Sequence, residues 1–223
     1  MLKFKSVYKM QRGFTIYNFP QGSPEWHQIR KGKLTMSNAA AAIGLSRFET
    51  AETLAEYLTG KKEKIFSERS LKLMKMGSER EAEMRDWYCQ EFPERKVTEI
   101  GFAVPDWCPQ IGCSPDGLVD DDGIIEIKHV VNFYNPTIVY FNFPEKKKLI
   151  EHIPESHYVQ IQGNLGILKR KWCDYIVKEF DGGHLMIRIP FDRSFWNDIQ
   201  KPRMLEFVAK YLNENKTDSL IKN

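Results

Sequence analysis

The stretch from Ser114 to Val130 reads SPDGLVDDDGIIEIKHV and restricts the fold more than any other part of the chain. Two apolar arms flank DDDG, a sequence typical of a tight turn, so the stretch predicts a β-hairpin. If the turn is centred on Asp121, then Asp116 and Glu126 are equidistant from it and directly opposed. The Cβ atoms of opposed residues lie about 4.5–5.5 Å apart. Two carboxylates are therefore expected on one face of the hairpin.

The alternation of strand side chains predicts the rest of that face. Lys128 and its opposite residue Ser114 fall on it, whereas Ile125 and Ile127 face the other way. Two converging carboxylates with a lysine beside them are what a divalent-metal site needs. The alternative is a Pro-Asp-Gly turn with an ion pair between Lys128 and Glu126 on a solvated strand face.

A single carboxylate, Glu81, interrupts an inward-facing stripe of the long helix that is predicted over residues 68–92. Spacings of three and four residues place five side chains on this stripe: Met74, Gly77, Glu81, Met84 and Tyr88. A buried carboxylate is unfavourable unless it is paired or bound to a metal, so Glu81 needs a cation inside the protein. The nearest candidate is the site on the hairpin.

The remaining pattern predicts one α/β or α+β domain over residues 1–223, with a small mixed sheet flanked by helices. Ser23 and Ser37 are the predicted caps of the first two helices. Helices are expected over residues 24–31, 37–43, 51–58, 68–92, 155–169 and 191–211, and strands over 97–104, 110–113, the two hairpin arms, 172–179 and 185–189.

Charge is distributed along the chain in three blocks. Residues 1–80 carry 15 basic and 7 acidic side chains, residues 81–126 carry 3 and 12, and residues 127–223 carry 15 and 11. Basic flanks around an acidic centre suit a polyanion held by its backbone while metal ions neutralise the central carboxylates. Solvated surface charge is the alternative.

The sequence indicates neither a cysteine-based metal site nor a segment for secretion or membrane insertion. The four cysteines include no CxxC pair, so neither a zinc nor an iron-sulfur site is expected. Neither a signal peptide nor a membrane span is indicated, so we expect a cytoplasmic protein with no membrane partner.

Four segments follow one another in an order that is typical of a known family. They are GSPEWHQIRKGKLTMS at 22–37, GSERE ending in Glu81, SPDGL followed by EIK at 126–128, and VQIQ at 159–162. From about residue 22 to 190 the chain thus resembles the phage lambda exonuclease family, also called the YqaJ-type viral recombinases, of the PD-(D/E)xK nuclease superfamily. Residues 1–20 and 132–148 match no motif of that family.

The resemblance implies a fold and a set of site residues. The fold would be a PD-(D/E)xK (restriction-endonuclease-like) core. Asp116, Glu126 and the backbone carbonyl of Ile127 would bind Mg²⁺ or Mn²⁺, as two ions. Glu81 would help to hold the metals and their water, and Lys128 would orient the attacking water. Contacts to DNA and to its 5′-phosphate would come from Arg30, Ser37, Ser114, Gln160, Gln162 and Arg47.

The resemblance also implies an activity and partners. The protein would be a 5′ to 3′ exonuclease that acts on linear double-stranded DNA ends, releases mononucleotides and leaves 3′ single-stranded tails for recombination by strand annealing. It would form a homotrimeric ring, work with a single-strand annealing protein and be encoded by a phage or prophage in a bacterial host. A sequence- or structure-specific endonuclease and a non-catalytic DNA-end-binding module are the alternatives.

Overall fold

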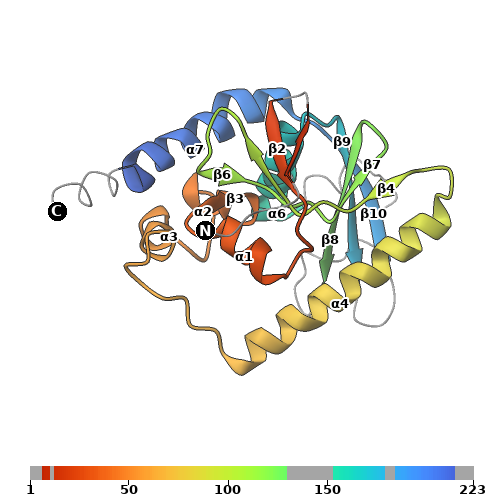
Figure 1. Ribbon diagram of the computed structural model, residues 1–223, viewed down its shortest axis with the longest axis horizontal. Helices are drawn as coiled ribbons and strands as arrows, with labels where there is room; N and C mark the ends of the chain where they lie inside the picture. The colour runs from red at the N-terminus through yellow and green to blue at the C-terminus, as the bar shows by residue number, and fades with distance from the viewer. Residues whose placement is uncertain (1–6, 11–12, 130–152, 179–183, 214–223) are drawn as a thin grey trace.

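A five-stranded mixed sheet lies at the centre of the computed structural model, which describes residues 7–10, 13–129, 153–178 and 184–213 (Figure 1). Its strands follow the order β10 (His184–Pro190), β9 (Trp172–Lys178), β8 (Gly123–His129), β7 (Gly117–Val119) and β4 (Val97–Thr98). β8 runs parallel to β9, and the other neighbours are antiparallel. β8 is thus the middle strand, and most of its side chains are buried.

The predicted hairpin is confirmed in its register. Gly117 pairs with Ile125 and Val119 pairs with Gly123, so the turn is centred on Asp121. Asp120 adopts a φ of +46°, in the left-handed region that aspartate tolerates better than most residues. The three aspartates therefore form the turn, as the DDDG pattern predicts.

Helices cover both faces of the sheet. They are α1 (Pro24–Arg30), α2 (Ala39–Ala42), α3 (Ala51–Leu58), α4 (Glu68–Glu91), α6 (Glu155–Leu168) and α7 (Lys201–Phe207). On one face, α4 packs its buried Met84 and Tyr88 against Ile125 and Ile127 of β8. On the other face, the buried residues of α6 and α7 join Ile124 in the larger core cluster. The predicted helices over 24–31, 51–58, 68–92 and 155–169 are confirmed to within one or two residues.

The predicted cap at Ser37 is wrong. The chain first forms a 3₁₀ turn, η1 (Met36–Asn38), and α2 follows it, so Ser37 lies inside the turn. The Ser37 hydroxyl pairs with Thr35 Oγ1 at 2.9 Å and makes no capping bond. Ser23, by contrast, accepts a hydrogen bond from the Trp26 N–H and caps α1 as predicted.

The predicted strand over 97–104 is two strands in different sheets. β4 joins the central sheet, whereas β5 (Phe102–Pro105) pairs with β2 (Phe14–Tyr17), which in turn pairs with β1 (Val7–Met10). The chain changes sheet at Gly101, where an added Cβ would lie 2.2 Å from the carbonyl oxygen of Tyr17. The predicted strand over 110–113 is reduced to β6 (Ile111–Gly112), which pairs with β3 (Leu34–Thr35).

The last helix begins later than residue 191. Asp192 accepts a hydrogen bond from the Phe195 N–H, so the aspartate ends the extended segment and starts the helix. Two π-helical segments, η4 (Phe195–Gln200) and η5 (Val208–Leu212), flank α7.

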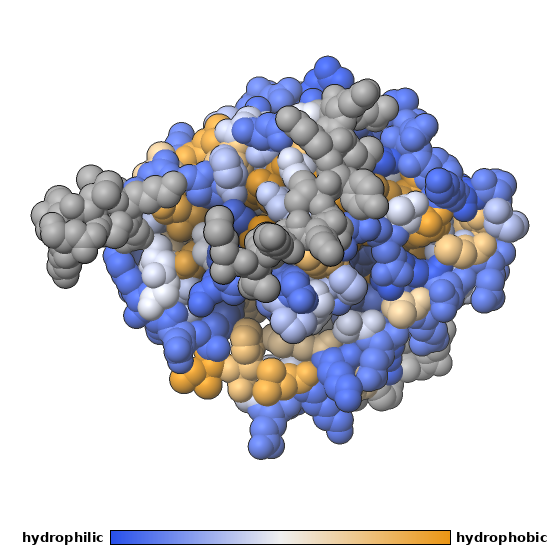
Figure 2. Space-filling view, viewed as in Figure 1, coloured by the Kyte–Doolittle hydropathy of each residue, from blue (hydrophilic) through white to orange (hydrophobic). Residues whose placement is uncertain are grey.

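The stripe predicted on α4 is buried only in its second half. Met74 is 51% exposed, whereas Met84 and Tyr88 are fully buried, and Glu81 lies between these two regions. The first half of α4 extends past the sheet in Figure 1. An apolar strip along the lower edge of the molecule lies over this part of the chain, where Ile65, Phe66 and Leu71 are exposed (Figure 2).

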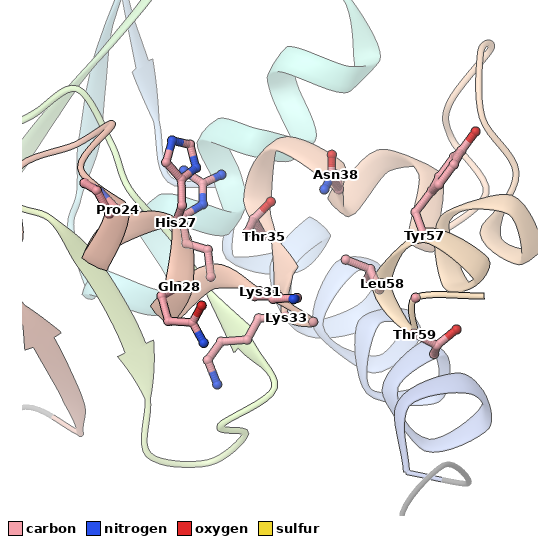
Figure 3. A pocket seen from close by; sticks show the side chains of 13 residues that line it. Pro24, His27, Gln28, Lys31, Lys33, Thr35, Asn38, Tyr57, Leu58 and Thr59 are labelled. Carbon is pink, nitrogen blue, oxygen red and sulfur yellow. The ribbon is translucent and has the colours of Figure 1, made fainter. Parts of the chain in front are cut away.

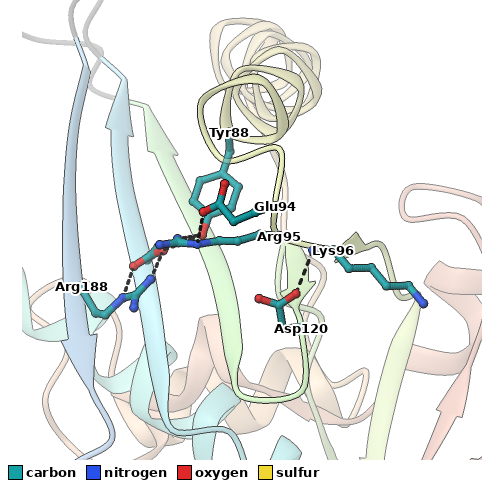
Figure 4. Close-up of polar contacts among 7 residues, drawn as sticks. Tyr88, Glu94, Arg95, Lys96, Asp120 and Arg188 are labelled. Carbon is teal, nitrogen blue, oxygen red and sulfur yellow. Dashed lines mark hydrogen bonds and ion pairs between the residues drawn. The ribbon is translucent and has the colours of Figure 1, made fainter.

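A buried ionic cluster fixes the second half of α4 to the sheet (Figure 4). Asp174 of β9 accepts hydrogen bonds from Arg188 Nε and Nη2, both at 2.8 Å, and from Arg95 Nη1 at 2.9 Å. The hydroxyl of Tyr88, on α4, donates to the same carboxylate at 2.6 Å. The Arg188 guanidinium also lies over the ring of Trp172.

Within the described part of the chain, every helix is too short or too polar to cross a membrane. Residues 132–148, which match no motif of the family, lie outside the described residues.

Candidate active site

The two predicted carboxylates meet at the open end of the hairpin. One step beyond the Gly117–Ile125 pair, the same register places Asp116 opposite Glu126. Asp116 is 8% exposed and Glu126 only 1%, so both carboxylates are inside the protein. Asp116 Oδ2 accepts a hydrogen bond of 2.6 Å from the backbone N–H of Ile127, which holds the aspartate against β8.

The Glu126 carboxylate is surrounded by hydrogen-bond donors. Lys128 Nζ lies 2.7 Å from Oε1, and Gln160 Nε2 donates to the same oxygen. Asn164 Nδ2 donates to Oε2 at 2.9 Å. The ion pair between Lys128 and Glu126 that the alternative interpretation expects therefore exists. Its carboxylate is buried, so the interpretation of this strand face as solvated is wrong.

Glu81 belongs to the same electrostatic group. Burial and, after it, the nearby charge of Asp116 raise the pKa of Glu81 to about 7, against the opposing effects of Lys128 and Arg85. Burial likewise raises the pKa of Glu126 to about 8, against the opposing effect of Lys128. Burial also raises the pKa of Asp116. Three carboxylates thus share a poorly solvated space with too little positive charge to ionise them all easily.

This arrangement fits a hard divalent cation. Among the described residues, no three side chains of His, Cys, Asp or Glu gather as a metal cluster. A cation would therefore be held by two carboxylates, Asp116 and Glu126, together with backbone or water oxygens, and Glu81 would act from further away. An all-oxygen donor set with excess negative charge is the kind that Mg²⁺ and Mn²⁺ prefer.

Arg30 is a half-buried cation that stacks on aromatic side chains. Its Cζ lies 3.7 Å from the centroid of the Trp26 ring and 5.8 Å from that of Phe102. Burial lowers its pKa to about 10, and no hydrogen-bond or ion-pair partner for it exists in the described part of the chain. A desolvated guanidinium without a carboxylate partner is a site for an anion.

Arg30 also lines a cavity of about 480 Å³ between α1 and α3 (Figure 3). Lys31 and His27 line it on the side of α1, and Tyr57 and Thr59 line the opposite side. The cavity is thus basic on one side and offers aromatic and hydroxyl groups on the other.

Ser114 is connected to Arg30 through Trp26. The Ser114 hydroxyl donates to the Gly101 carbonyl at 2.6 Å and accepts from Trp26 Nε1 at 3.1 Å. The charges of Glu126 and Arg30 both act on the buried thiol of Cys113, whose pKa burial raises. Arg30 and Glu126 therefore both lie close enough to Cys113 for their charges to act on it.

Of three further predicted contact residues, Gln162 and Arg47 are not brought into this group, and Ser37 reaches it only through its pairing with Thr35, which lines the same cavity as Arg30. Gln162 donates to the Pro190 carbonyl at 3.0 Å and accepts from the Asp192 N–H at 2.8 Å, so it joins α6 to the start of the last helix. Ser37 is exposed. Arg47 is exposed on the connection between α2 and α3, next to the 95% exposed Phe48.

Sequence reasoning missed Asn164 and the part played by Trp26. Asn164 lies one helical turn after Gln160 and shares its contact with Glu126. A signal was present, because an asparagine in the apolar run GNLGIL is as anomalous as the glutamines before it. The Arg30 guanidinium stacks on the Trp26 indole, whose Nε1 also donates a hydrogen bond to the Gly101 carbonyl at 3.2 Å.

The sequence model of the YqaJ-like viral recombinase domain matches residues 25–170, which include Arg30, all the carboxylates and Asn164. The chain belongs to the YqaJ-like viral recombinase family. No curated protein sequence matches it.

Solved structures resemble this YqaJ-family chain in fold. An alkaline exonuclease from Laribacter hongkongensis, LHK-Exo, has a TM-score of 0.68 at 23% identity, over 89% of this chain and 100% of that one. LHK-Exo in complex with dAMP has a TM-score of 0.64 at 24% identity, over the same shares. The fold is therefore of the PD-(D/E)xK type, a mixed sheet flanked by helices.

Proposed function

We propose that this protein is a metal-dependent DNA exonuclease that degrades one strand of linear duplex DNA from its 5′-phosphorylated end. The observation that carries the proposal is the buried pair of opposed carboxylates, Asp116 and Glu126, with Lys128 on the same face. Arg30, a half-buried cation for which the described residues provide no carboxylate partner, supports an anionic substrate. The likeness in fold to an alkaline exonuclease agrees with this activity.

The metal would be Mg²⁺ or Mn²⁺, in two ions, held by Asp116, Glu126 and the backbone carbonyl of Ile127, with Glu81 behind them. When bound, such ions supply an activated water and stabilise the leaving oxygen of an in-line displacement at phosphorus.

The side chains of the protein would have distinct tasks. Lys128 would orient the attacking water and counter the charge that grows on the phosphate in the transition state. Arg30 on Trp26, with Ser114, would bind the terminal 5′-phosphate, and this contact would set the direction of degradation. None of these groups reads a base edge, so cleavage would not depend on sequence. The products would be mononucleotides and a 3′ single-stranded tail.

The family suggests a setting for this activity. We propose that residues 1–223 act as one nuclease domain, that three copies form a ring around DNA, and that a single-strand annealing protein takes up the 3′ tail. We also propose that the protein is encoded by a phage or prophage and acts in the cytoplasm of its bacterial host.

The proposal is tested by comparing three substrates, each with Mg²⁺ or with EDTA. The substrates are a linear duplex with 5′-phosphates, the same duplex with 5′-hydroxyls, and closed circular plasmid. We expect mononucleotides to be released mainly from the first substrate and only with Mg²⁺. The Lys128→Ala variant should lose this activity and still bind DNA ends.

The other outcomes would each contradict a defined part of the proposal. Cleavage of the closed circle would identify an endonuclease. Binding of DNA ends that is unaffected by EDTA, without release of nucleotides, would identify a non-catalytic end-binding module.

A further inference from the structure

The side chain of Asn164 is unusually placed for a residue in the core. It is 1% exposed, its amide group donates to Glu126 Oε2, and its Oδ1 has no hydrogen-bond partner among the described residues. A buried polar atom without a partner destabilises a fold. A leucine in the apolar α6 would avoid this penalty but would leave Glu126 Oε2 without this donor, so what the asparagine contributes is its contact with Glu126.

Its position relative to Gln160 suggests an explanation. Residues four apart lie on the same side of a helix, and Gln160 and Asn164 both reach Glu126, one at each carboxylate oxygen. Gln162, two residues from each, points elsewhere and bonds to the Pro190 carbonyl. The α6 amides thus divide into a pair that contacts Glu126 and one that contacts the backbone.

We propose that Asn164 and Gln160 are positioning residues that fix the Glu126 carboxylate for cation binding. Both donors are neutral, so they fix its direction without neutralising the charge that attracts the cation. Lys128 cannot serve in this way, because its ammonium compensates that charge. This inference rests on the proposed function. It also gives Gln160 a different task from the 5′-phosphate contact that the family resemblance implies.

The test measures the binding of Mn²⁺ to the DNA-free protein by calorimetry, in wild type and in three variants that each replace one α6 amide. For Asn164→Leu and Gln160→Leu, we expect the dissociation constant for Mn²⁺ to rise about 10- to 100-fold, the usual effect of removing a group that orients a metal ligand. Gln162→Leu is the matched control, on the same helix and as buried as Asn164, and it should leave this constant unchanged. Circular dichroism checks the fold of each variant.

A further variant at Asn164 and a measurement of end preference for Gln160→Leu also test the two positioning roles. Asn164→Ser retains a donor in a shorter side chain and should fall between wild type and Asn164→Leu; it replaces Asn164→Leu if that variant does not fold. Gln160→Leu should keep the wild-type preference for 5′-phosphorylated over 5′-hydroxyl ends. If it loses this preference and binds Mn²⁺ normally, Gln160 contacts phosphate and is not a positioning residue.

Two further outcomes separate this inference from the proposed function. If wild type binds no Mn²⁺, the metal-dependent function itself fails. If wild type binds Mn²⁺ and degrades DNA, and Asn164→Leu binds the ion equally well, only the role of Asn164 is wrong.

Discussion

Arg30 is important because it stacks on Trp26 and has no carboxylate partner among the described residues. Its guanidinium is stacked on Trp26 in a partly buried position, which lowers its pKa to about 10, yet it stays charged at neutral pH. Stacking on an indole leaves the edge of the guanidinium, with its N–H donors, free for a planar or tetrahedral anion. A terminal phosphate, which carries more charge than an internal one, would benefit most.

We therefore expect Arg30→Ala to reduce the preference for 5′-phosphorylated over 5′-hydroxyl duplexes about 10- to 100-fold. This corresponds to about 1.5–3 kcal/mol, the usual contribution of a hydrogen bond to a charged group. The measurement is the ratio of initial degradation rates on the two duplexes. Lys31→Ala, which removes the same charge from the next residue, should leave the ratio nearly unchanged, and equal effects of the two variants would argue against a specific role for Arg30.

Individual site residues differed in how well the sequence could predict them. Strand alternation alone places Asp116, Glu126 and Lys128 on one face, because the period of two is fixed once the turn is known. Arg30 required the family resemblance, since its spacing of four residues from Trp26 allows the two side chains to stack but does not show that the pair lies beside the carboxylates. The direction of the α6 amides depends on the rotation of the helix against the sheet, which no local pattern encodes.

The helix α4 depends on contacts that are distant in sequence. Its second half is held to the sheet by the buried Asp174, which pairs with Arg95 and Arg188 and accepts from Tyr88. Because Glu81 lies on this helix, the same contacts also fix its distance from the hairpin carboxylates.

We expect Asp174→Asn to lower the free energy of unfolding by about 3 kcal/mol. This is the lower end of the range for removing one partner of a buried ion pair, because Arg188 reaches solvent. Urea unfolding measures the change. Asp122→Asn, which removes an exposed pair with Lys171, is the control and should change stability by less than about 1 kcal/mol. Equal effects of the two substitutions would mean that the buried cluster does not hold α4.

The boundaries of the long helices were predictable from the sequence. The sheet to which each strand belongs was not. Hydrophobic periodicity and caps gave α1, α3, α4 and α6 almost to the residue. The break at Gly101 depends on the backbone of Tyr17 lying against it. A glycine inside a strand pattern is a sign of such a close approach, but the sequence from Val97 to Val104 does not indicate which segment approaches.

At the scale of the whole molecule, the site makes stability depend on pH. The folded pKa values of Glu81 and Glu126, about 7 and about 8, lie above those of the unfolded chain. The folded state therefore binds more protons than the unfolded state, and stability is lost as pH rises through the folded pKa values. Burial lowers the pKa of His157 to about 4, so from pH 6.5 upward only the unfolded state binds a proton there, in at most about half of the molecules; this opposing effect is smaller than that of the two carboxylates and is gone by about pH 7.5.

We therefore expect the free energy of unfolding of the metal-free protein to fall as the pH is raised from 6.5 to 8. The slope for Glu126 should be at most about 1.4 kcal/mol per pH unit. Saturating Mg²⁺ should flatten or reverse it, because a cation stabilises the ionised carboxylates. Urea unfolding at four pH values, with EDTA or Mg²⁺, gives both slopes. A stability that is independent of pH in EDTA, or a slope that Glu126→Gln does not reduce, would contradict this prediction.

The hydrogen bond from the Ile127 N–H to Asp116 affects the choice of an inactive variant for trapping the protein on DNA. At this point the aspartate side chain takes the place of a neighbouring strand, so it is part of the edge of the sheet as well as a proposed metal ligand. Truncating Asp116 would remove both at once and leave a complex whose geometry no longer represents the native one. Lys128 makes its contact through a side chain alone, and its replacement is the cleaner way to obtain a bound, uncleaved duplex.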